Sequence, residues 1–249
     1  MKKNFLILFC LCIISKISLG QIFLDSNYIG HIISLKGGLS YIGIIDEKTY
    51  YDKYNGITPF FAIGWQNISD KKLFDLDFSY LKSDKIKYYS SNAKIKNVSL
   101  NICNSFKIKS FQLMNCKTNI YLGPIFDAFY IKRNQSDKLS SGFLFETFST
   151  KGLISLGING ILSCHINQKL QLKYSINSTA LSILKANDGT NLIGLNKALH
   201  LYSEVSILNH IFNNIYIGIV YRFDYFNNRH NYDTKVGEDN ISFNINFKL

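Results

Sequence analysis

The stretch ISFNINFKL, residues 241–249, places an apolar side chain at every odd position and a polar side chain at every even one, up to the last residue. Successive side chains of a β-strand point to opposite faces of its sheet. The pattern therefore predicts a strand with one apolar face and one polar face. Such a strand suits the wall of a transmembrane β-barrel, and it also suits a half-buried sheet in a soluble protein.

The first twenty residues have the composition of an export signal. An apolar run at residues 5–14 follows two lysines, and the sequence SLG at 18–20 offers small residues for cleavage before Gln21. The run is shorter than the about 20 apolar residues of a helix that crosses a membrane. We therefore expect residues 1–20 to be a signal peptide and residues 21–249 to form one exported domain.

Period-two alternation recurs through the rest of the chain. We predict ten strands, at residues 30–45, 57–67, 73–81, 97–102, 119–131, 153–164, 170–182, 198–208, 215–224 and 240–249. The long connections follow odd-numbered strands, at 46–56, 82–93, 132–151, 186–196 and 225–239. Short connections follow even-numbered strands, as in barrels with short periplasmic turns and long external loops. The connection at 109–117 is longer than this rule predicts, and residues 142–148 are expected to extend their hairpin beyond the membrane. The pattern also allows eight or twelve strands.

These features predict an all-β fold, a single antiparallel up-and-down transmembrane β-barrel. Its apolar side chains would face lipid and its polar side chains would line the lumen. The alternative is a soluble periplasmic β-sandwich or lipocalin-like barrel, whose apolar face would point inward. The alternation at the end of the chain favours the membrane barrel, and closure removes the unpaired strand edges that hydrocarbon does not accommodate.

Composition agrees with an exported barrel. The chain has 28 basic and 17 acidic residues, for a net charge of +11, and the lysines are scattered rather than clustered as in a nucleic-acid site. We expect a basic exterior to face anionic lipopolysaccharide. The 16 tyrosines and 19 phenylalanines suit aromatic girdles at the two interfaces. A mean hydropathy of +0.02 is too low for a helical membrane protein.

The first predicted strand contains the sequence SLKGGLS at residues 34–40, soon after the expected cleavage site. Together with the ordered last strand, this stretch resembles the small outer-membrane β-barrels of Bacteroidota, a porin-like group that includes the PorT component of the type IX secretion system. The resemblance implies one barrel of eight to ten strands, a last strand read by the barrel-insertion machinery, and no shared catalytic residues. Leu249 departs from the aromatic residue common at that end, and we expect Phe247 to replace it. Paired glycines at 37 and 38 predict a bulge or sharp curvature.

We predict no catalytic, metal or cofactor site. The histidines are His31, His165, His200, His210 and His230. His200 is expected near the outer rim, and its nearest serine, Ser203, is not at a same-face spacing. No G-x-S-x-G motif is present. His165 and Cys164 are adjacent and would point to opposite faces of a strand, which argues against a shared metal.

Three cysteines remain after the expected cleavage: Cys103, Cys116 and Cys164. An odd number cannot pair completely, and none lies in a CxxC spacing. Two of them could form a disulfide in an oxidising compartment, or all three are small apolar fillers.

Charged side chains on the polar faces of three strands are expected to meet inside the barrel. They are Asp75, Asp77, Lys173, Arg222 and Asp224. Buried charges must be paired, and the interior of a small barrel is just filled by side chains, so we predict a network that plugs the lumen. If the lumen stays wet, the same ring would line a narrow pore. The tyrosines of the first loop, Tyr50, Tyr51 and Tyr54, suit an interfacial aromatic belt or a surface that binds a glycan or a partner.

The sequence thus predicts a non-enzymatic outer-membrane barrel with a structural or assembly role in the envelope or in secretion. A narrow porin for small solutes is the alternative, and a lipid-modifying enzyme is a minor one. Expected partners are outer-membrane lipid and lipopolysaccharide, the barrel-insertion machinery, and other envelope or secretion proteins. We expect no cofactor and no nucleic acid.

Overall fold

The computed structural model describes residues 29–46, 52–88, 91–113, 116–138, 144–166, 169–186, 189–194, 198–212, 214–228 and 234–249. Its strands are β1 (Gly30–Asp46), β2 (Asp52–Ile68), β3 (Lys72–Tyr88), β4 (Ser91–Leu113), β5 (Cys116–Lys138), β6 (Leu144–His165), β7 (Leu170–Ala186), β8 (Gly189–Gly194), β9 (Ala198–Phe212), β10 (Ile215–Asn228) and β11 (Thr234–Lys248). In this part of the chain, no helix is long and apolar enough to span a membrane. The expected signal peptide lies outside the described residues.

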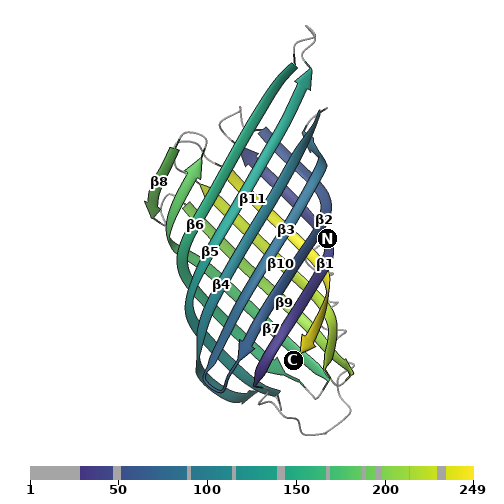
Figure 1. Cartoon of the computed structure of the whole chain (residues 1–249), viewed down its shortest axis with the longest axis vertical. Helices are drawn as coiled ribbons and strands as arrows, with labels where there is room; N and C mark the ends of the chain where they lie inside the picture. The colour runs from purple at the N-terminus through teal and green to yellow at the C-terminus, as the bar shows by residue number, and fades with distance from the viewer. Residues whose placement is uncertain are drawn as a thin grey trace.

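The strands close into a tilted antiparallel barrel (Figure 1). Each strand pairs with the next, and β1 closes the ring by pairing with β11 from Ile32 opposite Lys248 to Asp46 opposite Thr234. The short β8 pairs only with the outer part of β7 and stands outside the ring. Ten strands therefore form the wall, as the sequence predicts, and the eight- and twelve-strand alternatives are wrong.

Several strands are longer than predicted. β3 and β4 continue as a hairpin through most of 82–93, which the sequence assigns to a loop. β4 ends at Leu113 and β5 begins at Cys116, so the connection predicted at 109–117 is a short turn. The backbones of a hairpin can continue to exchange hydrogen bonds through residues that show no apolar alternation. The alternation used for the prediction therefore underestimates the length of these strands. The hairpin of β5 and β6 extends beyond the other strands at one end of the barrel (Figure 1), as expected from 142–148, of which 142 and 143 are not described.

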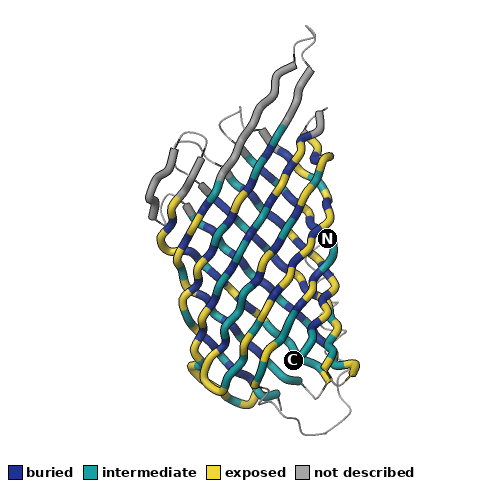
Figure 2. The backbone as a smooth tube through the Cα atoms, in the orientation of Figure 1, coloured by how far each residue is buried: buried dark blue, intermediate teal, exposed yellow. Residues whose placement is uncertain are grey.

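Burial alternates along each strand (Figure 2). On β11, Ser242, Asn244 and Asn246 are buried in the lumen, whereas Ile241 and Phe243 are 62% and 70% exposed on the outside. Apolar side chains likewise cover the outside of the other strands. A soluble protein would not expose so large an apolar surface, so the sandwich and lipocalin-like alternatives are wrong. The outer face meets lipid and the polar face lines the lumen.

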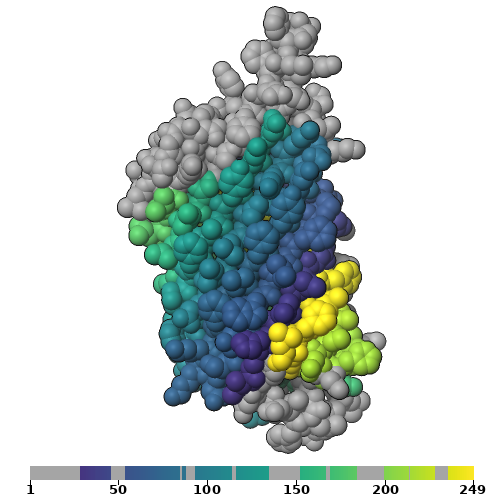
Figure 3. Space-filling model, viewed as in Figure 1, coloured from purple at the N-terminus to yellow at the C-terminus, as the bar shows by residue number. Residues whose placement is uncertain are grey.

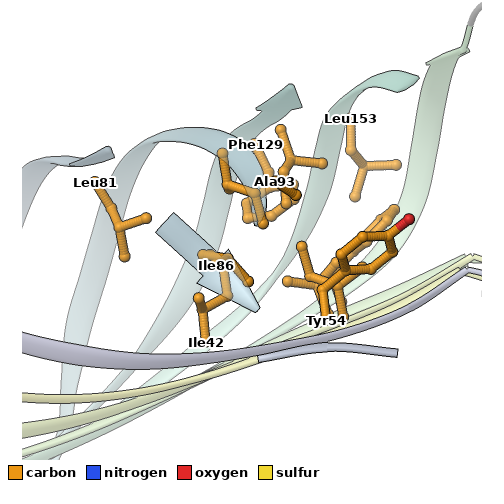
Figure 4. Close-up of a cluster of buried hydrophobic side chains, with 12 residues drawn as sticks. Ile42, Tyr54, Leu81, Ile86, Ala93, Phe129 and Leu153 are labelled. Atoms are coloured by element: carbon orange, nitrogen blue, oxygen red, sulfur yellow. The ribbon is translucent and has the colours of Figure 1, made fainter. Parts of the chain in front are cut away.

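One end of the lumen is apolar, which corrects the prediction of a polar interior throughout. Near the outer end, side chains from eight strands point into the barrel and pack together (Figure 4). We call this cluster the apolar layer; it consists of Ile42, Ile44, Tyr54, Leu81, Ile86, Ala93, Ile95, Phe129, Ile131, Leu153, Phe226 and Val236. Around Ile42 and Ile44 the outward neighbours are apolar or aromatic as well, whereas Ile95 lies between the exposed lysines Lys94 and Lys96, so the alternation that identifies the rest of the wall is absent or reversed here.

Gly38 lies where β1 and β11 come closest. The pairing of β1 is continuous with both neighbours through residues 37 and 38, so the predicted bulge is absent. A Cβ atom on Gly38 would lie 2.0 Å from the carbonyl oxygen of Ile241. The glycine therefore permits a close approach of two backbones at the strand pair that closes the barrel.

Replacing Gly38 with alanine is expected to lower the free energy of unfolding by about 1–3 kcal/mol, because the backbone of β11 must move away. The measurement is urea unfolding of the refolded barrel in detergent. Gly43→Ala on the same strand is the matched control, since a Cβ there meets nothing within 4 Å. Equal stability of the two variants would contradict the close-approach explanation.

Candidate functional site

A network of buried charges crosses the lumen below the apolar layer. Lys36 on β1 is at its centre: its Nζ donates to Asp77 Oδ2 at 2.9 Å and to Glu204 Oε2 at 2.8 Å. The hydroxyl of Tyr202 donates to the same Glu204 oxygen at 2.7 Å. One ammonium thus joins β1 to β3 and β9 across the interior, and each charge has an opposite charge beside it, as burial requires.

Arg222 on β10 extends this network. Its guanidinium donates to Asp77 Oδ1 at 3.2 Å and twice to Asp224 Oδ2, at 3.0 and 2.6 Å. A further bond reaches Ser99 on β4. The guanidinium also lies 4.3 Å from the ring centroid of Tyr202, so its flat face is covered as well as its edge. The whole side chain is only 2% exposed.

His200 connects the network to the apolar layer. Its Nδ1 is 2.5 Å from Asp127 Oδ2 and its Nε2 is 2.5 Å from Asp224 Oδ1. Both ring nitrogens therefore face the carboxyl group of an aspartate. On its outer side the ring lies 5.0 Å from that of Phe129, which stacks on Phe226 at 5.2 Å. The ionic and apolar layers are therefore in direct contact.

A second ion pair lies nearer the short turns. Lys173 Nζ is 2.9 Å from Asp75 Oδ2, which also accepts from the Gln66 amide at 2.8 Å. A cavity of about 60 Å³ lies beside it, at the end of the barrel that holds the carboxyl terminus. Tyr121, Tyr216 and other polar side chains line this cavity. Leu73, Tyr121 and Ile161 form a second, smaller buried apolar cluster at this end of the barrel.

Solved structures share this architecture, whereas the sequence matches no family model and no curated protein. The translocator domain of the autotransporter NalP from Neisseria meningitidis superposes with a TM-score of 0.51 at 13% identity, covering 91% of this chain and 91% of that one. The outer membrane protease OmpT from Escherichia coli gives a TM-score of 0.47 at 9% identity, over 92% of this chain and 99% of that one. The chain has the fold of an outer-membrane β-barrel. At these identities the likeness concerns the fold.

In this outer-membrane barrel, all five charged residues named from the sequence face the lumen. Asp77, Arg222 and Asp224 belong to one network. Asp75 and Lys173 form a separate ion pair with each other. The prediction omitted six charged groups that also line the lumen: Lys36, Asp127, Arg133, His200, Glu204 and Glu238. Each lies an even number of residues from other inward-facing positions of its strand, so counting in steps of two along the strand could have identified it.

The histidines of the barrel lie at both of its ends. His200, expected near the outer rim, is the third residue of β9, and its side chain points into the lumen on the same face as Tyr202 and Glu204. Ser203 lies on the opposite face of the same strand, near the hydroxyl of Tyr174. His31 stacks on Trp65 and His210 on Tyr216. His230 lies outside the described residues.

Other candidates from the sequence are also located. Tyr54 is not a loop residue: it is buried in the apolar layer of the lumen, with the guanidinium of Arg133 4.5 Å from its ring. Tyr50 and Tyr51 lie outside the described residues. Cys103, Cys116 and Cys164 form no disulfide in the part of the chain that the structure describes. Within the described ranges, no group of three or more His, Cys, Asp or Glu side chains could hold a metal ion.

Proposed function

We propose that this protein is a sealed, non-enzymatic barrel that acts as a structural or assembly element of the bacterial envelope. The observation that carries the proposal is that two successive layers fill the lumen. The first is the charge network around Lys36 and Arg222, and the second is the apolar layer beyond it. An ion that entered from the short-turn end would have to break paired charges and then cross packed hydrocarbon. Each step is costly, so a sealed lumen is expected.

The charge network favours sealing over catalysis as well. His200 holds both of its nitrogens against carboxylates and is 2% exposed. It therefore has no free position from which to accept a proton from a substrate. Ser203 faces the outside of the wall, so these two residues do not form a nucleophile and base pair. Both features support a barrel without a hydrolytic site.

An assembly role is further supported by the resemblance of residues 34–40 to the PorT-type barrels of Bacteroidota. In this chain, Lys36 of that stretch holds the lumen network together, and Gly38 permits the contact that closes the barrel. Both residues of this stretch therefore contribute to the stability of the barrel, as a scaffold requires. Its partners would be the insertion machinery and other envelope or secretion proteins.

Single-channel recording in planar lipid bilayers tests the proposal. We expect the purified barrel to give no step-like openings, because both layers remain intact. The variant Lys36→Ser/Arg222→Ser/Phe129→Ser/Phe226→Ser removes the centre of each layer and is expected to conduct, which shows that insertion and detection work. Heat-modifiable migration in detergent gels verifies that each protein is folded. Regular openings of the unmodified barrel would replace the sealed scaffold with the narrow porin.

A further inference from the structure

Three lysines form a row on the outside of the wall. Lys82 on β3 pairs directly with Lys96 on β4, and Lys96 pairs directly with Lys132 on β5. The residues just before them, Leu81, Ile95 and Ile131, belong to the apolar layer and point into the lumen. Successive side chains of a strand alternate between its faces, so each lysine points outward. Lys82 and Lys96 are exposed and Lys132 is half-buried. Neighbouring strands are about 4.8 Å apart, so three ammonium groups share a span of roughly 10 Å.

The three ammonium groups lie close enough to repel one another. Like charges directly opposite each other on neighbouring strands destabilise a sheet. Lys94, exposed two residues further along β4, adds another positive charge. Asp84 on β3 is an exposed acid close by, and it is outnumbered by the lysines. A bound group with negative charge would remove this repulsion.

The row lies at the depth of lipid headgroups. Two residues toward the membrane centre, Tyr80 and Tyr130 occupy the same outer face, with Val98 paired between them. Interfacial tyrosines mark the level where acyl chains meet headgroups, and two residues of strand place the lysines about 7 Å further out. The ammonium of Lys96 lies 5.7 Å from the ring centroid of Tyr80, so the two groups belong to one surface.

Below the tyrosines the wall is apolar. Phe78 on β3 pairs with Leu100 on β4, and Phe126 is exposed on β5. Strands β3, β4 and β5 form the broad face turned toward the viewer in Figure 3. An amphiphile lying on this face would therefore place its chains on hydrocarbon and its headgroup on the lysines.

The charge on this face is local. At the outer end of β11, on another side of the barrel, the outward face carries one base and one acid: Lys235, and Asp239, which accepts a hydrogen bond from the hydroxyl of Tyr221. A barrel that attracted anions only through its overall positive charge would show no such difference between its sides. The lysine row therefore defines one side for an anionic ligand.

We propose that Lys82, Lys96 and Lys132 bind the phosphate of a phosphorylated lipid in the outer leaflet. The lysines neutralise the phosphate, the tyrosines contact the region just below the headgroup, and the acyl chains lie on the apolar wall. A free phosphate ion would use only the first of these three contacts. The site is independent of whether the lumen is sealed.

Native mass spectrometry of the delipidated full chain in non-ionic detergent tests the site, with bisphosphorylated lipid A as the probe. We expect one lipid A to bind, and the variant Lys82→Gln/Lys96→Gln/Lys132→Gln to bind it roughly 100-fold more weakly, since each surface lysine contributes appreciably to attraction of an anionic lipid. Lipid A stripped of its phosphates should bind the unmodified protein as weakly as the variant binds intact lipid A.

The matched control is Lys71→Gln/Lys109→Gln/Lys169→Gln, which removes the same charge from exposed lysines at the short-turn end. It should bind lipid A like the unmodified protein. If the triple variant fails the heat-modifiability check, the single variant Lys96→Gln replaces it in the test. We expect this variant to bind lipid A about fivefold more weakly than the unmodified protein. Equal binding by the row variant and the control would overturn the proposal. So would competition by inorganic phosphate at the same concentration as lipid A, because the ligand would then be the free ion.

Discussion

Replacing Arg222 with methionine is expected to lower the free energy of unfolding by about 3–5 kcal/mol, the loss typical when one partner of a buried ion pair is removed. The guanidinium makes hydrogen bonds to Asp77, Asp224 and Ser99, and it is almost completely buried. Methionine fills much of the same volume and leaves two carboxylates facing each other in the lumen. The loss therefore comes from unpaired charge and only in small part from a cavity.

Urea unfolding in lipid vesicles measures this loss, with the fluorescence of Trp65, the single tryptophan, as the signal. Asp224→Asn alone should also destabilise the barrel. Combined with Arg222→Met it should cost less than the sum of the two, because the neutral amide no longer needs the guanidinium. Additive losses, or a loss below about 1 kcal/mol for Arg222→Met, would mean that the network contributes little to the stability of the wall.

The second large effect is expected from the variant Phe129→Ala/Phe226→Ala. These rings stack on each other inside the apolar layer, and they are 3% and 1% exposed. Removing both leaves a gap in a packed interior, and a single buried Phe→Ala substitution typically costs about 3–5 kcal/mol. His200 would also lose its apolar cover, so water would reach the charge network from the outer side.

Two measurements examine this variant. Urea unfolding should show a loss well above that of the control Phe61→Ala, whose side chain is 59% exposed on the outer face. Acyl chains can fill the space left by Phe61, whereas nothing fluid replaces the rings inside the barrel. Hydrogen exchange at the outer ends of β5 and β10 should become faster in the double variant. Similar losses for the inner and outer substitutions would argue that the apolar layer is not tightly packed.

The charge network was predictable in part. Asp75, Asp77, Lys173, Arg222 and Asp224 were recognised because they stand at polar positions between apolar neighbours. Their partners follow from the same parity, yet pairing depends on which strands face each other across the lumen. The contact between Lys36 and Glu204 joins residues 168 positions apart. No local pattern encodes that distance.

The apolar layer escaped prediction for a different reason. Ile42 and Ile44 point inward. Their neighbours Tyr41 and Ile45 are also aromatic or apolar, so the sequence shows no alternation there. The same holds around Phe129 and Ile131. Where both faces of a strand are apolar, the sequence identifies a strand and does not reveal which face looks into the barrel.

The sequence by itself predicted the strand content, a wall of ten strands and an outer face that suits lipid. The export signal stays a prediction. These properties are local, because a period of two and a turn are visible within ten residues. Only the tertiary structure decided which charges meet in the lumen, that an apolar layer closes its outer end, and that three lysines align on neighbouring strands. Those properties depend on register and on closure, which bring distant strands together and fix which residue stands opposite which.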